Sequence, residues 1–173
     1  MYELELLEPT KELEAAIMEY RQEYILNGEK INGSLGLVHY DDYSEWLEKV
    51  NKTQKAETSP LGVATTTYFS IRKSDGKIIG TIQLRHDLTD ELREHGGHIG
   101  YGVRPSERGK GYGKQQLMLV LDIARQMGIQ KVMISCTKDN IASRQTAISC
   151  GGVLARENIY KDLEQQIFWI NLQ

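Results

Sequence analysis

Cysteine is scarce in this chain, and neither sign of charge dominates it. The only two cysteines, Cys136 and Cys150, exclude a disulfide framework and a metal site of the CxxC type, so we expect no bound metal. The 21 Lys and Arg residues face 24 Asp and Glu residues, which gives a net charge of −3. A chain without an excess of positive charge is a poor candidate for nucleic-acid binding.

Long apolar runs are missing as well. No stretch approaches the roughly 18 apolar residues of a membrane-spanning helix. The first residues, Met1 to Leu7, lack the basic start and the apolar run of a secretory signal peptide. We therefore expect a cytoplasmic protein with no membrane partner.

The chain does have enough apolar content for a core. It holds 173 residues, of which 40% are hydrophobic, and about 100–200 residues is the usual length of one domain. A domain of this size buries about 70% of the surface that its unfolded chain exposes. We interpret residues 1–173 as a single domain, with a helical part at 1–60 and a core at 61–173.

Hydrophobic spacing and turn residues predict the order of the elements. Alternating or β-branched and aromatic runs predict strands at 2–7, 63–72, 77–87, 98–103, 131–136, 153–160 and 165–172. Helical spacing predicts helices over 10–27, 43–50, a stretch closed by Gly128, and about 140–150. The order is βααβββαβαββ, an α/β (α+β) fold with a mixed sheet. If the strands at 98–103 and 131–136 are parallel neighbours, the connection between them should be a right-handed crossover.

The most informative segment connects a predicted strand to a predicted helix and reads VRPSERGKGYGK over residues 103–114. Its glycines, Gly109, Gly111 and Gly113, permit positive φ and a close approach to the backbone. The first N–H groups of a helix lack partners and carry partial positive charge, so they bind phosphate well. Residues 104–114 also carry a net charge of +3 in a chain whose net charge is −3. The segment therefore predicts a phosphate-binding loop, with a simple tight turn as the alternative.

Two common nucleotide-binding motifs do not fit this segment. A P-loop needs Gly-x4-Gly-Lys-Ser/Thr, and a dinucleotide fingerprint needs Gly-x-Gly-x-x-Gly. Counted from Gly109 or from Gly111, the third glycine of the fingerprint would fall on Lys114 or on Gln116. What remains is Arg-x-x-Gly-x-Gly, from Arg108 to Gly113, and a nucleotide binder becomes a distant alternative.

This remaining motif resembles the pyrophosphate-binding motif of the GNAT superfamily of N-acetyltransferases, which is Arg/Gln-x-x-Gly-x-Gly/Ala after a strand ending in Val-x-Pro. The chain has Val103-Arg104-Pro105 before it. The family's second motif, Asn-x-x-Ser/Ala on the next helix before a glycine-rich break, reads Asn140-Ile141-Ala142-Ser143 and Gly151-Gly152 here. The resemblance covers roughly residues 60–172 and implies a mostly antiparallel central sheet flanked by helices.

The resemblance also implies binding of acetyl-coenzyme A (acetyl-CoA) and direct transfer of its acetyl group to an amine. Backbone N–H groups of residues 109–114 would hold the pyrophosphate, and the strand at 101–103 would pair with the pantetheine arm. Asn140, which is also a candidate helix cap, would lie near the pantetheine or the thioester. The implied cofactor-binding residues are Tyr101, Gly102, Val103, Arg108, Gly109, Lys110, Gly111, Tyr112, Gly113, Lys114, Asn140 and Ser143.

Two basic side chains of the segment allow two interpretations. Arg104 and Lys110 could contact the cofactor, or they could be solvated surface charges. The two cysteines fit small core residues better than nucleophiles.

A base for the amine is less directly indicated. Many relatives carry a Glu before Ile-Gly-Tyr on the strand that leads to the phosphate loop, and His98 occupies that position here. Because histidine titrates near neutral pH, we interpret His98 as the candidate catalytic base. The alternative is a histidine that only packs or binds a backbone group, and Glu91 and Glu94 are the runners-up.

The usual acid is absent from its usual place. Relatives often protonate the departing thiolate with a Tyr seven residues after the motif Asn, and that position is Ala147 here. Tyr101 or Tyr160 could substitute for it, or the thiolate could leave without help.

The acceptor amine is not identified by any motif. Residues 1–60 form the acceptor side in relatives, and an acidic, aromatic groove there would suit a cationic amine. The residues in question, which a solvated helix face explains equally well, are Tyr24, Glu29, His39, Tyr40, Asp41, Asp42, Tyr43 and Trp46.

Two functions from different classes therefore remain. The leading one is an acetyl-CoA-dependent N-acetyltransferase that acts on an amine of a small molecule or peptide. The alternative is a non-catalytic acyl-CoA sensor. The last two predicted strands could also pair with a second copy of the chain and form a homodimer.

Overall fold

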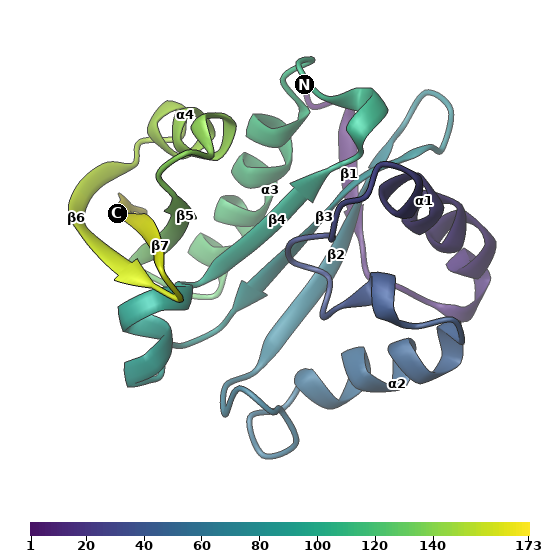
Figure 1. Cartoon of the computed structure of the whole chain (residues 1–173), viewed down its shortest axis with the longest axis horizontal. Coiled ribbons are helices and arrows are strands. Elements are labelled where there is room, and N and C mark those ends of the chain that lie inside the picture. Colours follow the sequence, from purple (N-terminus) through teal and green to yellow (C-terminus); the bar gives the residue numbers. More distant parts are fainter.

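The computed structural model describes all 173 residues and contains two antiparallel sheets that lie next to each other (Figure 1). In the first sheet the order is β1-β2-β3-β4, and in the second it is β5-β7-β6. The strands of the first sheet are β1 (Leu4–Leu7), β2 (Thr65–Arg72), β3 (Ile78–Arg85) and β4 (Ile99–Val103). Those of the second are β5 (Lys131–Thr137), β6 (Val153–Tyr160) and β7 (Leu163–Asn171).

Four helices pack on these sheets: α1 (Glu14–Leu26), α2 (Tyr43–Thr53), α3 (Tyr112–Gln126) and α4 (Ile141–Ser149). Short helical turns occur at Lys11–Leu13, Leu37–His39 and Pro105–Glu107, and one π-helical turn occurs at Leu92–Gly96. The predicted order βααβββαβαββ is confirmed. The segment expected to be only a charged connection, 88–97, contains the π-helical turn.

The two faces of the first sheet follow from strand alternation, because successive side chains of a strand point to opposite faces. Phe69 and Ile71 of β2 join a core with Trp46 of α2 and Tyr20 of α1. Ile82 of β3 belongs to a second core, in which α3, β5 and β7 also take part. The helices α1 and α2 therefore cover one face, and α3 covers the other.

The segment between α1 and α2 is held against β4. The buried guanidinium of Arg21 donates to the carbonyl oxygens of Leu37 and Val38, 3.1 and 3.0 Å away. At Gly33, where φ is +71°, an added Cβ would collide with the backbone of Gly100 in β4. Glycine is required there because it tolerates both the positive φ and the close approach.

Strands β4 and β5 differ from the simplest sequence expectation. They are not paired neighbours in one sheet but belong to different sheets. They meet through His98 and Met133, where the His98 N–H donates to the Met133 carbonyl oxygen at 2.8 Å. Beyond this point the Tyr101 side chain of β4 reaches the first turn of α4 instead of β5. A parallel ladder that would define a right-handed crossover between these two strands is therefore not formed.

Strand β6 is the outer strand of the second sheet and has a largely exposed surface. Its exposed apolar side chains include Val153, Leu154 and Ile159. Pairing of this edge with a second copy stays a prediction. None of the helices is both long enough and apolar enough to cross a membrane.

Candidate functional site

A cleft with a volume of about 760 Å³ is bordered by β4, the loop before α3, α4 and the segment that follows α1. Its lining includes every cofactor residue implied by the sequence except Lys110. Those lining residues are Tyr101, Gly102, Val103, Arg108, Gly109, Gly111, Tyr112, Gly113, Lys114, Asn140 and Ser143. Residues far apart in the sequence therefore meet around one cavity, and His98 is not among them.

The loop and the first turn of α3 present a row of free backbone donors. None of the N–H groups of residues 109–114 donates to a protein acceptor; the first such bond in this stretch runs from Gln115 N to Gly111 O. Gly109 and Gly111 have φ of +77° and +81°, and an added Cβ at either would meet no protein atom within 4 Å. Both glycines are therefore needed for their backbone conformation. The free N–H groups and the helix dipole together suit an anion.

One edge of β4 also offers main-chain groups to the cleft. Hydrogen bonds from Arg104 N to Ile79 O and from Arg85 N to His98 O fix which β4 residues bond to β3. In an antiparallel pair the bonded residues alternate, so the N–H and C=O groups of Tyr101 and Val103 point away from β3. The Val103 carbonyl oxygen accepts from Arg108 Nε at 3.0 Å. The main chain of Tyr101 is thus placed to pair with an extended ligand.

The Tyr101 side chain connects β4 to α4. Its hydroxyl lies 3.0 Å from Ser143 Oγ and 3.2 Å from the Ser143 carbonyl oxygen, to which it donates. Burial raises the pKa of Tyr101 to about 12. The phenol therefore stays protonated at neutral pH and acts as a hydrogen-bond donor.

Asn140 caps α4, as predicted. Its side-chain oxygen accepts from Ser143 N at 3.2 Å, which satisfies one of the free N–H groups at the helix start. The Asn140 residue also lines the cleft, so capping and ligand contact are compatible. Further along the same helix, Thr146 and Ser149 line the cleft too. Ser143, Thr146 and Ser149 follow one another at intervals of three residues, and this helical spacing is visible in the sequence.

Arg108 lies at the mouth of the loop and already has a protein partner. Its guanidinium is 3.1 Å from the Glu29 carboxylate and lies over the Tyr24 ring, 5.8 Å from its centroid. The hydrogen bond from Arg108 lowers the pKa of Glu29. The chain that follows α1 therefore forms a wall of the cleft, and Tyr24 and Glu29 belong to this wall.

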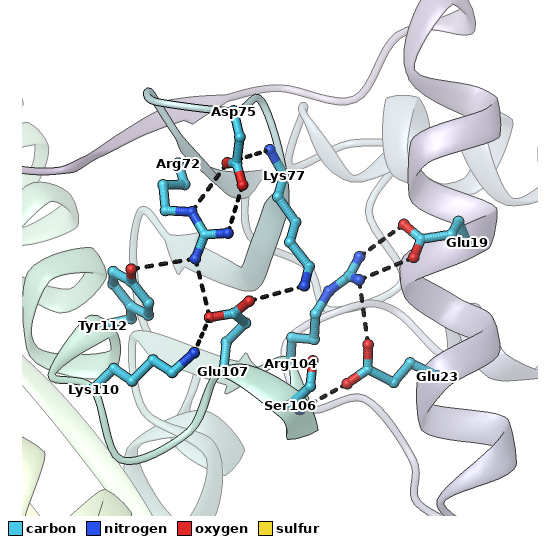
Figure 2. Close-up of polar contacts among 10 residues, drawn as sticks. All are labelled: Glu19, Glu23, Arg72, Asp75, Lys77, Arg104, Ser106, Glu107, Lys110 and Tyr112. Carbon is cyan, nitrogen blue, oxygen red and sulfur yellow. Dashed lines mark hydrogen bonds and ion pairs between the residues drawn. The ribbon is translucent and has the colours of Figure 1, made fainter.

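The cationic character of the loop is smaller than its sequence indicates. Arg104 is only 1% exposed and is paired with Glu19 and Glu23 of α1, at 3.0 and 3.2 Å (Figure 2). Lys110 is 2.8 Å from Glu107. Neither cation lines the cleft. The lysines that do line it, Lys30 and Lys114, have no carboxylate partner. Lys30 was missed by sequence reasoning because no motif marks it.

His98 does not fit the role of catalytic base. It is 7% exposed, and its Nδ1 accepts a hydrogen bond from Met133 N at 2.9 Å. In a neutral imidazole one nitrogen is the acceptor and the other carries the hydrogen, so the single lone pair that could take a proton is already occupied. Burial lowers the pKa of His98 to about 4. The histidine that binds a backbone group is thus the alternative that the geometry supports.

The other proton-transfer candidates lie in different places. Ala147 is fully buried in the core, so no acid stands at the family's usual position. The Tyr160 ring stacks on His95, with centroids 4.2 Å apart, and does not line the cleft. Glu91 and Glu94 do not line it either. Of the groups considered for proton transfer, Tyr101 alone faces the cavity.

The strand order, the separation of β4 from β5 and the glycine-rich turn at the start of α3 define an acetyltransferase fold. In agreement, the family model described as acetyltransferase (GNAT) family matches residues 15–151. The match covers more than half of the chain, and the protein therefore belongs to this family. No curated protein matches the chain.

Solved structures resemble this one over nearly their whole length. The protein yncA from Salmonella typhimurium, described as an acetyltransferase and solved with acetyl-CoA, is 18% identical with a TM-score of 0.67, and the match covers 99% of this chain and 95% of that one. The microcin C7 self-immunity acetyltransferase MccE, solved with acetyl-CoA and AMP, is 18% identical with a TM-score of 0.71 and coverages of 99% and 93%. A chimera of the Vibrio cholerae spermidine N-acetyltransferase SpeG and hSSAT is 15% identical with a TM-score of 0.67 and coverages of 99% and 96%. At these identities the likeness concerns the fold.

Proposed function

We propose that this protein is an N-acetyltransferase that uses acetyl-CoA to acetylate an amine of a small molecule or a peptide. The main support for the proposal is that the N–H groups of residues 109–114 donate to no protein acceptor. These residues lie at the start of α3 and, apart from Lys110, line the cleft. Family membership and the acetyl-CoA bound to the similar structures support it.

Different groups of the chain bind different parts of the cofactor. The N–H groups of residues 109–114 hold the pyrophosphate, and Lys30 and Lys114 supply unpaired positive charge beside it. The free main-chain groups of Tyr101 pair with the pantetheine arm. Asn140 and Ser143, at the start of α4, border the same cavity.

Acetyl-CoA supplies an activated acyl group: the amine nitrogen bonds to the thioester carbonyl carbon, the carbon–sulfur bond breaks, and the sulfur leaves as a thiolate. The amine must be neutral, and a lysine-like amine with a pKa of about 10.4 is neutral in only about one molecule in 10³ at pH 7. A base or a water chain must therefore take its proton. We assign the proton for the thiolate to the Tyr101 hydroxyl, because it is the one candidate that lines the cleft. For this step its hydrogen must turn from the Ser143 carbonyl oxygen, to which it is donated in this structure, towards the sulfur.

The acceptor is proposed only as an amine. Similar structures include a spermidine N-acetyltransferase, a ribosomal protein acetyltransferase and an immunity acetyltransferase, so the shared fold serves acceptors of very different size. On the acceptor side Arg21 is buried and binds Asp41 at 3.1 Å, which makes Asp41 a structural partner as well as a candidate contact for a cation.

The first test is calorimetric titration of acetyl-CoA into the wild-type protein and two glycine variants. Gly111→Val places a side chain in the cleft at a φ of +81°, whereas Gly128→Val creates the same backbone strain (φ +83°) at the far end of α3. Each variant should lose about 1–2 kcal/mol of stability from that strain. Binding should be lost in Gly111→Val only. Absence of wild-type binding at about 1 mM, which is weaker than −4.1 kcal/mol, would refute the proposal.

A turnover assay distinguishes an N-acetyltransferase from a non-catalytic acyl-CoA sensor. The protein is incubated with acetyl-CoA and a panel of amines, and released thiol is measured. We expect at least one amine to raise thiol release well above the hydrolysis background. Tight acetyl-CoA binding without turnover of any polyamine, amino acid or peptide amine would support the non-catalytic sensor instead.

A further inference from the structure

The carboxylate of Glu107 is buried at the entrance to the phosphate loop. Glu107 ends the short helical turn Pro105–Glu107 and precedes the glycine-rich residues by two positions. Its side chain is only 5% exposed, and three cations surround it (Figure 2). Arg72 Nη1 lies 3.0 Å away, and the ammonium groups of Lys77 and Lys110 lie 2.8 Å away.

These cations come from two sides of the loop. Arg72 ends β2 and Lys77 precedes β3, so both belong to the hairpin between these strands. Lys110 belongs to the loop itself, and its ion pair with Glu107 spans Gly109. Arg72 also donates to the Tyr112 hydroxyl at 3.3 Å. Glu107 thus joins the loop to the β2–β3 hairpin through Arg72 and Lys77, and its pair with Lys110 connects two residues of the loop itself.

The loop needs such fixation because its own backbone is permissive. Glycine loses more conformational freedom on ordering than any other residue, and residues 109–113 contain three glycines. The N–H groups of residues 109–114 make no protein hydrogen bond that would hold them. A buried carboxylate with several charge-assisted hydrogen bonds is a strong, directional anchor. Burying a carboxylate costs free energy, so a role in keeping the protein surface soluble does not explain the buried position of Glu107.

We propose that Glu107 is the positioning residue of the phosphate loop: through Arg72, Lys77 and Lys110 it holds the N–H groups of residues 109–114 in the conformation that binds the cofactor pyrophosphate. Glu107 itself does not need to contact the cofactor for this role. The inference rests on the proposed function, and it assigns Lys110 to loop geometry instead of direct phosphate contact.

The test compares Glu107→Gln with Asp75→Asn. Asp75 belongs to the same network, where it binds Arg72 at 2.6 and 3.0 Å, but it does not touch the loop. Two quantities are measured in each protein: the Kd of acetyl-CoA by calorimetry, and the order parameters of the Gly109 and Gly111 amides by NMR relaxation. If Glu107→Gln leaves the binding conformation about 10% populated, the Kd rises about tenfold. The order parameters should fall from about 0.85 towards 0.6.

The control fixes the meaning of each outcome. We expect Asp75→Asn to change the Kd less than twofold, and amides of α4 to stay rigid in both variants. The inference would be overturned if Glu107→Gln and Asp75→Asn had the same Kd for acetyl-CoA and the same loop order parameters. If Glu107→Gln fails to fold, Lys77→Gln removes one anchor from outside the loop and should shift both quantities in the same direction; unchanged values there would overturn it as well. Absence of acetyl-CoA binding to the wild-type protein would instead refute the proposed function.

Discussion

Mild acid should destabilise this protein through His98, and the size of the effect can be worked out from the structure. In the folded protein the imidazole is buried, accepts from Met133 N, and has a pKa of about 4. Burial is the main cause; Arg93 and Arg85 lower the pKa further, and Asp87 opposes them. In the unfolded chain the pKa returns to about 6.5. The unfolded state therefore binds more protons between these two values.

The sign and the magnitude follow from proton linkage. Stability rises with pH wherever the unfolded state binds more protons. The stability that the neutral, buried His98 contributes is therefore complete above about pH 6.5 and is lost progressively as the pH falls towards 4. At pH 5 the unfolded His98 is about 97% protonated and the folded one about 9%. This difference removes about 1.8 kcal/mol of stability between pH 7 and pH 5.

Urea denaturation at pH 7 and at pH 5 measures this difference. The variant His98→Gln keeps an oxygen that can accept from Met133 N, but this side chain does not titrate. The decrease in its free energy of unfolding between pH 7 and pH 5 should therefore be about 1.8 kcal/mol smaller than that of the wild type. His39→Gln, at an exposed site, is the matched control for loss of an imidazole and should behave as the wild type does. If His98→Gln shows the wild-type difference to within about 0.5 kcal/mol, the reasoning about His98 is wrong.

Two further substitutions test the side-chain contacts of Tyr101 and Arg104. Tyr101→Phe removes the hydroxyl that binds Ser143 and should cost about 1 kcal/mol in urea denaturation; it should also lower kcat if the phenol protonates the thiolate, and an unchanged kcat would exclude that role. Arg104→Met breaks the ion pairs with Glu19 and Glu23 and should cost about 2 kcal/mol, less than the 3–5 kcal/mol typical of a fully buried pair, because Glu19 is 67% exposed. A loss below about 0.5 kcal/mol would show that this buried arginine contributes only as a surface pair does.

The sequence predicted the elements and the glycine-rich turn before α3 well, because both depend on local patterns. Strand alternation, helical spacing and the cap at Asn140 involve residues that are near each other in the chain. The Arg108–Gly113 motif marks a turn whose glycines need positive φ, and Gly109 and Gly111 have it.

The charges and the proton-transfer groups could not be assigned in this way. The sequence leaves open whether Arg104 and Lys110 contact the cofactor or are solvated, and the structure instead pairs them with Glu19, Glu23 and Glu107. His98 occupies the position of the family's base, yet its lone pair is used by Met133, which lies in another sheet. A residue type at a motif position does not reveal which partner occupies its polar atoms.

The sequence by itself determined the family, the order of strands and helices, and the place of the glycine-rich loop before α3, since short-range patterns and glycine chemistry specify these. The tertiary structure decided which cations face the cleft, which titratable groups are free to act, and that residues after α1 complete the cavity. Each of these depends on contacts between segments separated by many residues, such as Arg108 with Glu29. Burial and pairing arise only when those segments fold together, and they set both charge and pKa.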